Sequence, residues 1–142
     1  MKSRRPLLLV EDDEIDVMTI QRAFKTLKVT NRLNVAGNGE EALAHLRDPN
    51  TMTPCIILLD LNMPRMGGLE FLGIVKADPI LRRIPVIILT SSREERDRLA
   101  SFDKSVAGYM VKPVEYDQIV EVMKTINMYW TLSELPGDEQ DV

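Results

Sequence analysis

Residues 55–68 read CIILLDLNMPRMGG, in which four consecutive aliphatic residues lead directly to an acid, Asp60. A short aliphatic run bounded by turn-forming residues is typical of a buried β-strand, and the Asn, Pro and Gly residues that follow predict a turn. The sequence therefore places a carboxylate at the end of a rigid strand. Its purpose depends on which residues other segments bring beside it.

The composition indicates one globular domain. The chain has 142 residues, of which 44% are hydrophobic and 28% charged, as in soluble globular proteins. Its 18 Lys and Arg residues against 22 Asp and Glu residues give a net charge of −4. Such a balance provides no basic surface for nucleic acid, so we expect no direct DNA binding.

Cysteine usage and hydropathy favour the cytoplasm. Cys55 is the only cysteine, which excludes a disulfide within the chain. The apolar run at residues 7–10 ends at an acidic triplet, too early for a signal peptide. No apolar stretch approaches the about 20 residues that a membrane-spanning helix needs, so we expect no membrane association.

Short apolar segments alternate with amphipathic ones along most of the chain. The expected strands are residues 7–10, 32–36, 56–59, 86–89 and 109–111. The helices between them are expected from apolar residues at helical spacing: Ile15, Met18, Ala23, Phe24 and Leu27; Ala42, Leu43 and Leu46; Leu69, Leu72 and Val75; Leu99 and Ala100; Tyr116, Ile119, Val120, Met123 and Ile126. This alternation predicts an α/β fold with a parallel sheet covered by helices on both faces.

Capping residues support three helix starts. Asp13 is placed to cap the first helix. Asn38 with Glu41, and Ser92 with Glu95, have the spacing in which cap and acid satisfy each other's backbone amides.

Polar residues follow four of the five expected strands. Glu11, Asp12 and Asp13 follow the first, Asp60 the third, Thr90 the fourth and Lys112 the fifth. The carboxyl ends of parallel strands share one edge, where ligands bind at the point at which strand order reverses. Because the second strand ends without a reactive residue, we place it outermost, which gives the doubly wound order 2-1-3-4-5.

The acids at this edge predict a divalent-cation site. Each polar residue has a structural explanation when taken singly, but together they favour a site. Carboxylates from Glu11, Asp12 and Asp60 would repel one another unless a cation lay among them. Oxygen ligands without His or Cys select Mg²⁺ or a similar ion such as Mn²⁺. With Thr90 and Lys112 available to a phosphoryl group, Asp60 is the natural nucleophile.

In its motifs at the strand ends, the chain resembles the response-regulator receiver domains of two-component signalling. The matching motifs are VEDD at 10–13, LDLNMPRMGG at 59–68, LTSS at 89–92 and GYMVKP at 108–113. They span residues 5–128, which we expect to form the domain. The resemblance implies a flavodoxin-like doubly wound five-stranded sheet. Two departures are small: Glu11 stands where Asp is commoner, and Gly67 where Asp is frequent.

The resemblance also implies a role for each residue. Asp60 is the phosphoacceptor; Glu11, Asp12 and the backbone carbonyl of Asn62 hold magnesium; Thr90 and Tyr109 are the switch pair; Lys112 pairs with the phosphate; Asn62 and Ser92 tune the lifetime of the acyl phosphate. The implied donor is a histidine kinase or a phosphotransfer protein. Phosphorylation would then alter the face made by the fourth helix, fifth strand and fifth helix, in a signalling protein with at most self-phosphorylation and self-dephosphorylation activity.

The C-terminal extension, residues 129–142, carries a second expectation. Tyr129, Trp130 and Leu132 would form an exposed apolar patch beyond the fifth helix. A homodimer interface through the last helix and tail is favoured, and packing back onto the same domain is the alternative. This tail resembles the stand-alone regulators paired with cyanobacterial phytochrome kinases, which suggests a bacteriophytochrome as the sensor kinase. The acidic GDEQDV end is expected to be disordered.

Three rival functions fit the sequence less well. A haloacid dehalogenase-type phosphatase needs a second Asp two residues after its nucleophile, where this chain has Asn62. Acids after the first strand would repel a flavin phosphate. A receiver-like scaffold without phosphotransfer is disfavoured because every expected functional residue is present. The lone His45 is most simply a solvated residue on the second helix.

Overall fold

A computed structural model describes residues 5–61, 63, 65–90, 106–111, 115–121 and 124. Within this part of the chain, one parallel sheet has the strand order β2-β1-β3-β4-β5, as predicted. The strands are β1 (Leu7–Val10), β2 (Leu33–Ala36), β3 (Ile56–Asp60), β4 (Val86–Thr90) and β5 (Gly108–Val111). The near-continuous aliphatic sequences of β1, β3 and β4 reflect a sheet that is covered on both faces.

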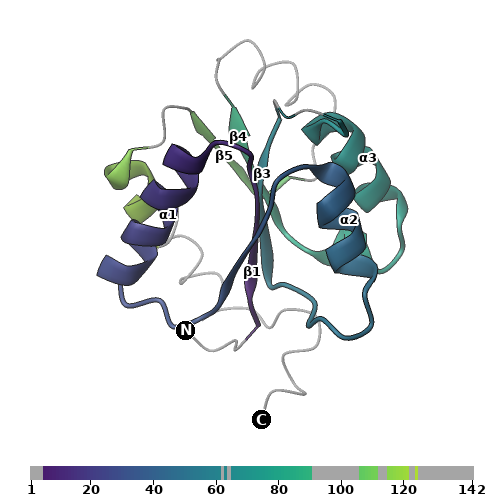
Figure 1. The fold of residues 1–142 in the computed structure, drawn as a ribbon, viewed down its shortest axis with the longest axis horizontal. Helices are drawn as coiled ribbons and strands as arrows, with labels where there is room; N and C mark the ends of the chain where they lie inside the picture. The colour runs from purple at the N-terminus through teal and green to yellow at the C-terminus, as the bar shows by residue number, and fades with distance from the viewer. Residues whose placement is uncertain are drawn as a thin grey trace.

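Helices cover the two faces of the sheet (Figure 1). The described elements are α1 (Glu14–Thr26), α2 (Gly39–Arg47), α3 (Gly68–Ala77) and the 3₁₀ turn η1 (Leu81–Arg83), and residues 116–121 are also helical. On one face, Leu7 and Leu9 pack in a cluster with Phe24 of α1. On the other, Leu8 and Val10 join a cluster with residues of α2 and α3. The alternation of side chains along β1 thus anchors both layers.

The caps of α1 and α2 form at the predicted residues, with one correction. The Asp13 carboxylate accepts from the amide of Ile15 at 2.8 Å, and the Asn38 side chain accepts from the amide of Glu41 at 2.9 Å. The Glu41 carboxylate, however, accepts from the amide of Gly37 at 2.7 Å, whereas reciprocal capping would direct it to Asn38. The long Glu41 side chain reaches past the cap residue and satisfies the amide before it.

Two residues of the apolar pattern that predicted α1 point to solvent. Ile15 is 74% exposed and Met18 is 56% exposed, while Ile20 and Phe24 are buried. The helix carries two overlapping apolar stripes, and the sheet is covered by the stripe that runs through Ile20 and Phe24, on a different side of the helix from Ile15. The apolar spacing predicted the helix correctly, but Ile15 and Met18 do not lie on its core-facing side.

Two other helices show the same kind of difference. Leu69 is 47% exposed, because Phe71 and Leu72 take the inward positions of α3. Tyr116 is 43% exposed and Ile119 is buried, so the core-facing stripe of this last helical segment does not include Tyr116.

Some of the predictions concern residues outside the described part of the chain. These are the fourth helix at Leu99 and Ala100 with its Ser92 and Glu95 cap, Met123 and Ile126, and the extension with Tyr129, Trp130 and Leu132. Among the described residues, no helix has the length and apolarity required to cross a membrane.

Candidate functional site: an acidic cluster at the carboxyl edge

The ends of β1 and β3 bring three acids together. Val10 lies beside Leu59 in the parallel register, so the chain leaving β1 passes next to Asp60, the last residue of β3. The amide of Glu11 donates to the carbonyl of Ala36 at 2.9 Å, which ties this turn to β2. Carboxylate oxygens of Glu11, Asp12 and Asp60 consequently lie within 4.8 Å of one another.

The burial of these acids determines their chemistry. Asp60 is 0% exposed and Glu11 is 1% exposed, whereas Asp12 is exposed. One oxygen of Glu11 accepts from the amide of Asp13 at 3.0 Å, which orients the side chain. Negative charges this close repel strongly away from bulk water, and a cation among them removes the repulsion. A donor set of oxygens alone fits Mg²⁺ or Mn²⁺.

Gly68 allows α3 to begin directly behind Asp60. A Cβ atom at position 68 would collide with the carbonyl oxygen of Asp60 and lie 2.6 Å from the Cα of Leu61. The amide of Gly68 donates to the carbonyl of Leu61 at 3.2 Å. Only glycine fits this position, and the close packing holds the acid between the sheet and the helix.

The ends of β4 and β5 lie at the same edge. Leu89 pairs with Asp60, so β4 ends directly beside the acids, and the backbone of Thr90 pairs with Val111, so β5 ends at the same edge one strand further out. Tyr109 lies on β5, half-buried against the cluster beneath α2 and α3. Lys112, Asn62, Ser92 and the side chain of Thr90 are outside the described residues, and their roles stay predictions.

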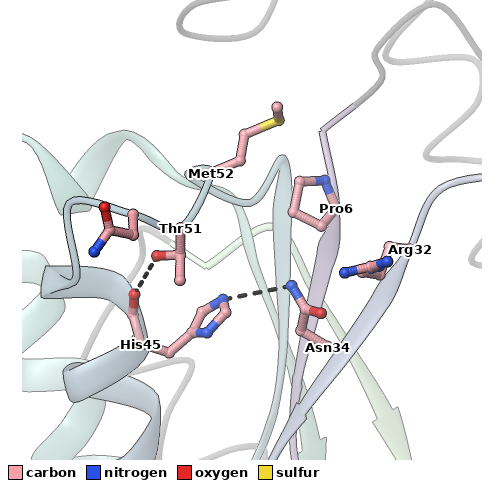
Figure 2. A pocket seen from close by; sticks show the side chains of 7 residues that line it. Pro6, Arg32, Asn34, His45, Thr51 and Met52 are labelled. Atoms are coloured by element: carbon pink, nitrogen blue, oxygen red, sulfur yellow. Dashed lines mark hydrogen bonds between the residues drawn. The ribbon is translucent and has the colours of Figure 1, made fainter.

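A pocket of about 340 Å³ lies at the opposite edge, where β1, β2 and β3 begin (Figure 2). It is lined by Pro6, Arg32, Asn34, His45, Asn50, Thr51 and Met52, none of which was a predicted site residue. The His45 ring lies 3.4 Å from the Asn34 amide, and the His45 carbonyl accepts from the Thr51 hydroxyl at 2.6 Å. His45 is half-buried and its ring contacts Asn34 of β2, so the expectation that it is simply solvated was wrong.

These features define a doubly wound α/β protein with an oxygen-donor cation site where its strand order reverses. The family profile described as "Response regulator receiver domain" matches residues 7–124. The chain belongs to this family.

Its relatives include phytochrome regulators. The response regulator Rcp1 of Synechocystis sp. is 35% identical over 128 residues, covering 87% of each chain. The structure of the phosphorylated cyanobacterial phytochrome response regulator RcpA superposes with a TM-score of 0.78 at 36% identity, covering 94% of this chain and 99% of RcpA. The bacteriophytochrome response regulator RtBRR gives 0.78 at 40% identity, covering 84% and 76%.

Family membership confirms the general function expected from the sequence. Receiver domains are signalling modules of two-component systems, with a histidine kinase as partner and Mg²⁺ or Mn²⁺ as cation. Rcp1 has a structure in its Mn²⁺-bound form, and the cluster of Glu11, Asp12 and Asp60 in this chain suits the same ion. Neither a phosphatase nor a receiver-like scaffold without phosphotransfer is favoured.

Proposed function

We propose that Asp60 accepts a phosphoryl group from the phosphohistidine of a sensor kinase or of a phosphotransfer protein. The observation that carries this proposal is the buried Asp60 carboxylate at the end of β3, with Glu11 and Asp12 oxygens within 4.8 Å. A carboxylate oxygen of Asp60 forms the new bond to phosphorus. The bond between phosphorus and the imidazole nitrogen breaks, and its electron pair leaves with the imidazole.

The residues around Asp60 bind the cation and the phosphoryl oxygens. Glu11, Asp12 and the backbone carbonyl of Asn62 would hold the divalent ion. When bound, this ion supplies positive charge to the transferring phosphoryl group. Lys112 follows β5 directly and pairs with a further phosphoryl oxygen, and the Thr90 hydroxyl at the end of β4 donates to another. Asp60 itself is fixed by its strand and by the packing of Gly68 behind it.

Phosphorylation then shifts the protein between two packings. The Thr90 hydroxyl moves toward the phosphoryl group, and Tyr109 turns into the vacated space. Support comes from the register: Tyr109 lies beside Ile88, on the strand that Thr90 ends, and its ring is half-buried. The output is a changed face at the fourth helix, β5 and the fifth helix. Asn62 and Ser92 control how readily water reaches the acyl phosphate. The protein itself has at most self-phosphorylation and self-dephosphorylation activity.

The exposed apolar residues of α1 supply a docking surface for the phosphodonor. Ile15 and Met18 are three positions apart, so they share one face of the helix, and both are exposed. They follow Asp12 within two helical turns, and a carboxylate oxygen of Asp12 lies within 4.8 Å of one of Asp60. An apolar contact here would hold the donor histidine against the acidic edge while leaving the charged residues to the chemistry.

The proposed partner is a phytochrome-type kinase, and the proposed assembly is a homodimer. The similarity to RcpA and RtBRR supports a phytochrome-type kinase as the donor. Residues 5–128 form the receiver domain, and residues 129–142 form the extension. Tyr129, Trp130 and Leu132 join two copies of the chain, which acts in the cytoplasm without contacting DNA.

A labelling experiment tests the proposed function. Purified protein is incubated with acetyl phosphate and Mg²⁺, and the intact mass is measured before and after removal of the ion with EDTA. We expect a gain of one phosphoryl group that requires the ion and is absent in Asp60→Asn. The matched control, Asp13→Asn, changes a nearby exposed cap and should still be labelled. Equal labelling of Asp60→Asn and the wild type would reject Asp60 as the acceptor.

A further inference from the structure

A contact between α2 and the loop after Asp60 lies beside the acidic cluster. The amide of Gly39, the first residue of α2, donates to the carbonyl of Met66 at 3.2 Å. A Cβ atom at position 39 would lie 2.7 Å from Cγ, 2.9 Å from Sδ and 3.0 Å from Cβ of Met66. The absence of a side chain at Gly39 is therefore what allows Met66 to seat on the end of the helix.

This contact restrains a loop whose backbone is strained. Arg65, directly before Met66, has φ of 61°, a left-handed conformation that is unfavourable for a residue with a side chain. Such a conformation persists when the surroundings hold it in place. Two backbone hydrogen bonds hold this loop. The amide of Gly68 donates to the carbonyl of Leu61 at 3.2 Å, and the amide of Gly39 donates to the carbonyl of Met66.

The amino end of α2 is a rigid support for the loop. Asn38 is buried and accepts from the amide of Glu41 at 2.9 Å, and Glu41 in turn accepts from the amide of Gly37 at 2.7 Å. These bonds fix the first turn of the helix, which leaves the amide of Gly39 to be satisfied by the loop carbonyl. The position of α2 therefore determines where the loop after Asp60 lies.

We infer that Gly39 and Met66 are positioning residues for the cation site, acting through the loop that leaves Asp60. The inference rests on the proposed function, because it takes the carboxylates of Glu11, Asp12 and Asp60 as ligands of the ion. Gly39 and Met66 are not among these ligands. Each holds the loop directly after Asp60, and a displaced loop moves Asp60 relative to Glu11 and Asp12 and so weakens binding.

A double-mutant cycle with Mn²⁺ as the probe tests this inference. Mn²⁺ affinity is measured by calorimetry for the wild type, Gly39→Ala, Met66→Ala and the double variant. We expect Gly39→Ala to weaken Mn²⁺ binding about tenfold, since its methyl group displaces Met66. Met66→Ala keeps the backbone bond and should weaken binding about threefold. The double variant should bind more tightly than Gly39→Ala, because the clashing Cγ and Sδ atoms are gone.

A matched control separates positioning from stability. Ala44→Gly lies on the exposed face of the same helix and should lower the midpoint of thermal unfolding without changing Mn²⁺ affinity. Wild-type affinity in Gly39→Ala, an equal loss of affinity in Ala44→Gly, or no recovery in the double variant would each overturn the inference. If Gly39→Ala does not fold, Met66→Ala alone decides it, and wild-type affinity in that variant overturns it. A wild type that does not bind Mn²⁺ would overturn the proposed cation site as well.

Discussion

Glu11 and Asp60 hold carboxylate oxygens within 4.8 Å of each other although both side chains are buried. This pair carries an electrostatic cost in the metal-free protein that a divalent ion removes. The same arrangement that opposes folding without the ion therefore supplies the affinity for it. Stability and cation binding are linked at this pair, and the link is measurable.

Removing one charge of the pair separates these two effects. Glu11→Gln should lower Mn²⁺ affinity by at least about tenfold, since it removes one negative charge from the ligand set. It should also raise the free energy of unfolding of the metal-free protein by about 1 kcal/mol, because the repulsion with Asp60 is relieved. Calorimetry and urea unfolding with and without Mn²⁺ provide the measurements. Glu14→Gln, at an exposed position, is the control, and equal effects of the two substitutions would contradict the assignment.

Truncation of the α1 surface tests donor docking. The double substitution of Ile15→Ala and Met18→Ala should lower kcat/KM for phosphotransfer from the partner kinase about tenfold, through lost apolar contact. Phosphorylation by acetyl phosphate should not change, because this small donor does not touch the surface. Ile80→Ala is a matched control, since Ile80 is 71% exposed and precedes β4, at the opposite edge of the sheet. An equal loss with both donors would show that the substitutions affect the acidic site and not docking.

Two glycines of α3 should respond in opposite directions to alanine. Gly68→Ala should destabilise the protein by about 2 kcal/mol or more, since its methyl group meets the backbone of Asp60 and Leu61. Gly73 lies inside the helix, and a methyl group added there would meet no atom within 4 Å, so Gly73→Ala should stabilise by about 1 kcal/mol. Urea unfolding measures both, and a neutral Gly68→Ala would refute the tight packing behind the acid.

The end of α1 offers a stabilising substitution far from the site. Lys28 has φ of 59°, its amide donates to Lys25 at 3.1 Å, and the amide of Val29 donates to Phe24 at 2.9 Å. This is the helix ending in which glycine is preferred at the left-handed position. Lys28→Gly should therefore stabilise by about 0.5–1 kcal/mol in thermal unfolding. Lys28→Ala keeps the strained backbone and should show no gain; an equal gain would assign the effect to the lost Lys side chain.

The sheet and the acidic cluster were predictable because each depends on local sequence. The inner strands β1, β3 and β4 are short aliphatic runs, so the run before Asp60 is recognisable without its neighbours. The strand order followed from one asymmetry, the lack of a reactive residue after Ala36. Once that order is known, Glu11, Asp12 and Asp60 must meet, and the structure places them together.

The failed predictions involve choices that only packing makes. Periodicity finds an apolar stripe on α1, but two overlapping stripes are present, and the sheet selects the one without Ile15. His45 contacts Asn34 of β2, and Gly39 contacts Met66 across two elements, with no local pattern to mark either pair. The contact with Asn34 places His45 in a pocket, and the contact with Met66 makes Gly39 a support of the loop. Neither contact can be recognised from the neighbouring sequence.

We assign the phosphoryl group to the Asp60 carboxylate, and chemical mapping identifies the residue that carries it. Protein treated with acetyl phosphate and Mg²⁺ is reduced with borohydride, which converts an aspartyl phosphate to homoserine, and peptides are sequenced by mass spectrometry. Homoserine at position 60 is the predicted result, with none in the sample prepared with EDTA. Homoserine at position 12, 13 or another acid, with an intact Asp60, would exclude Asp60 as the phosphoacceptor.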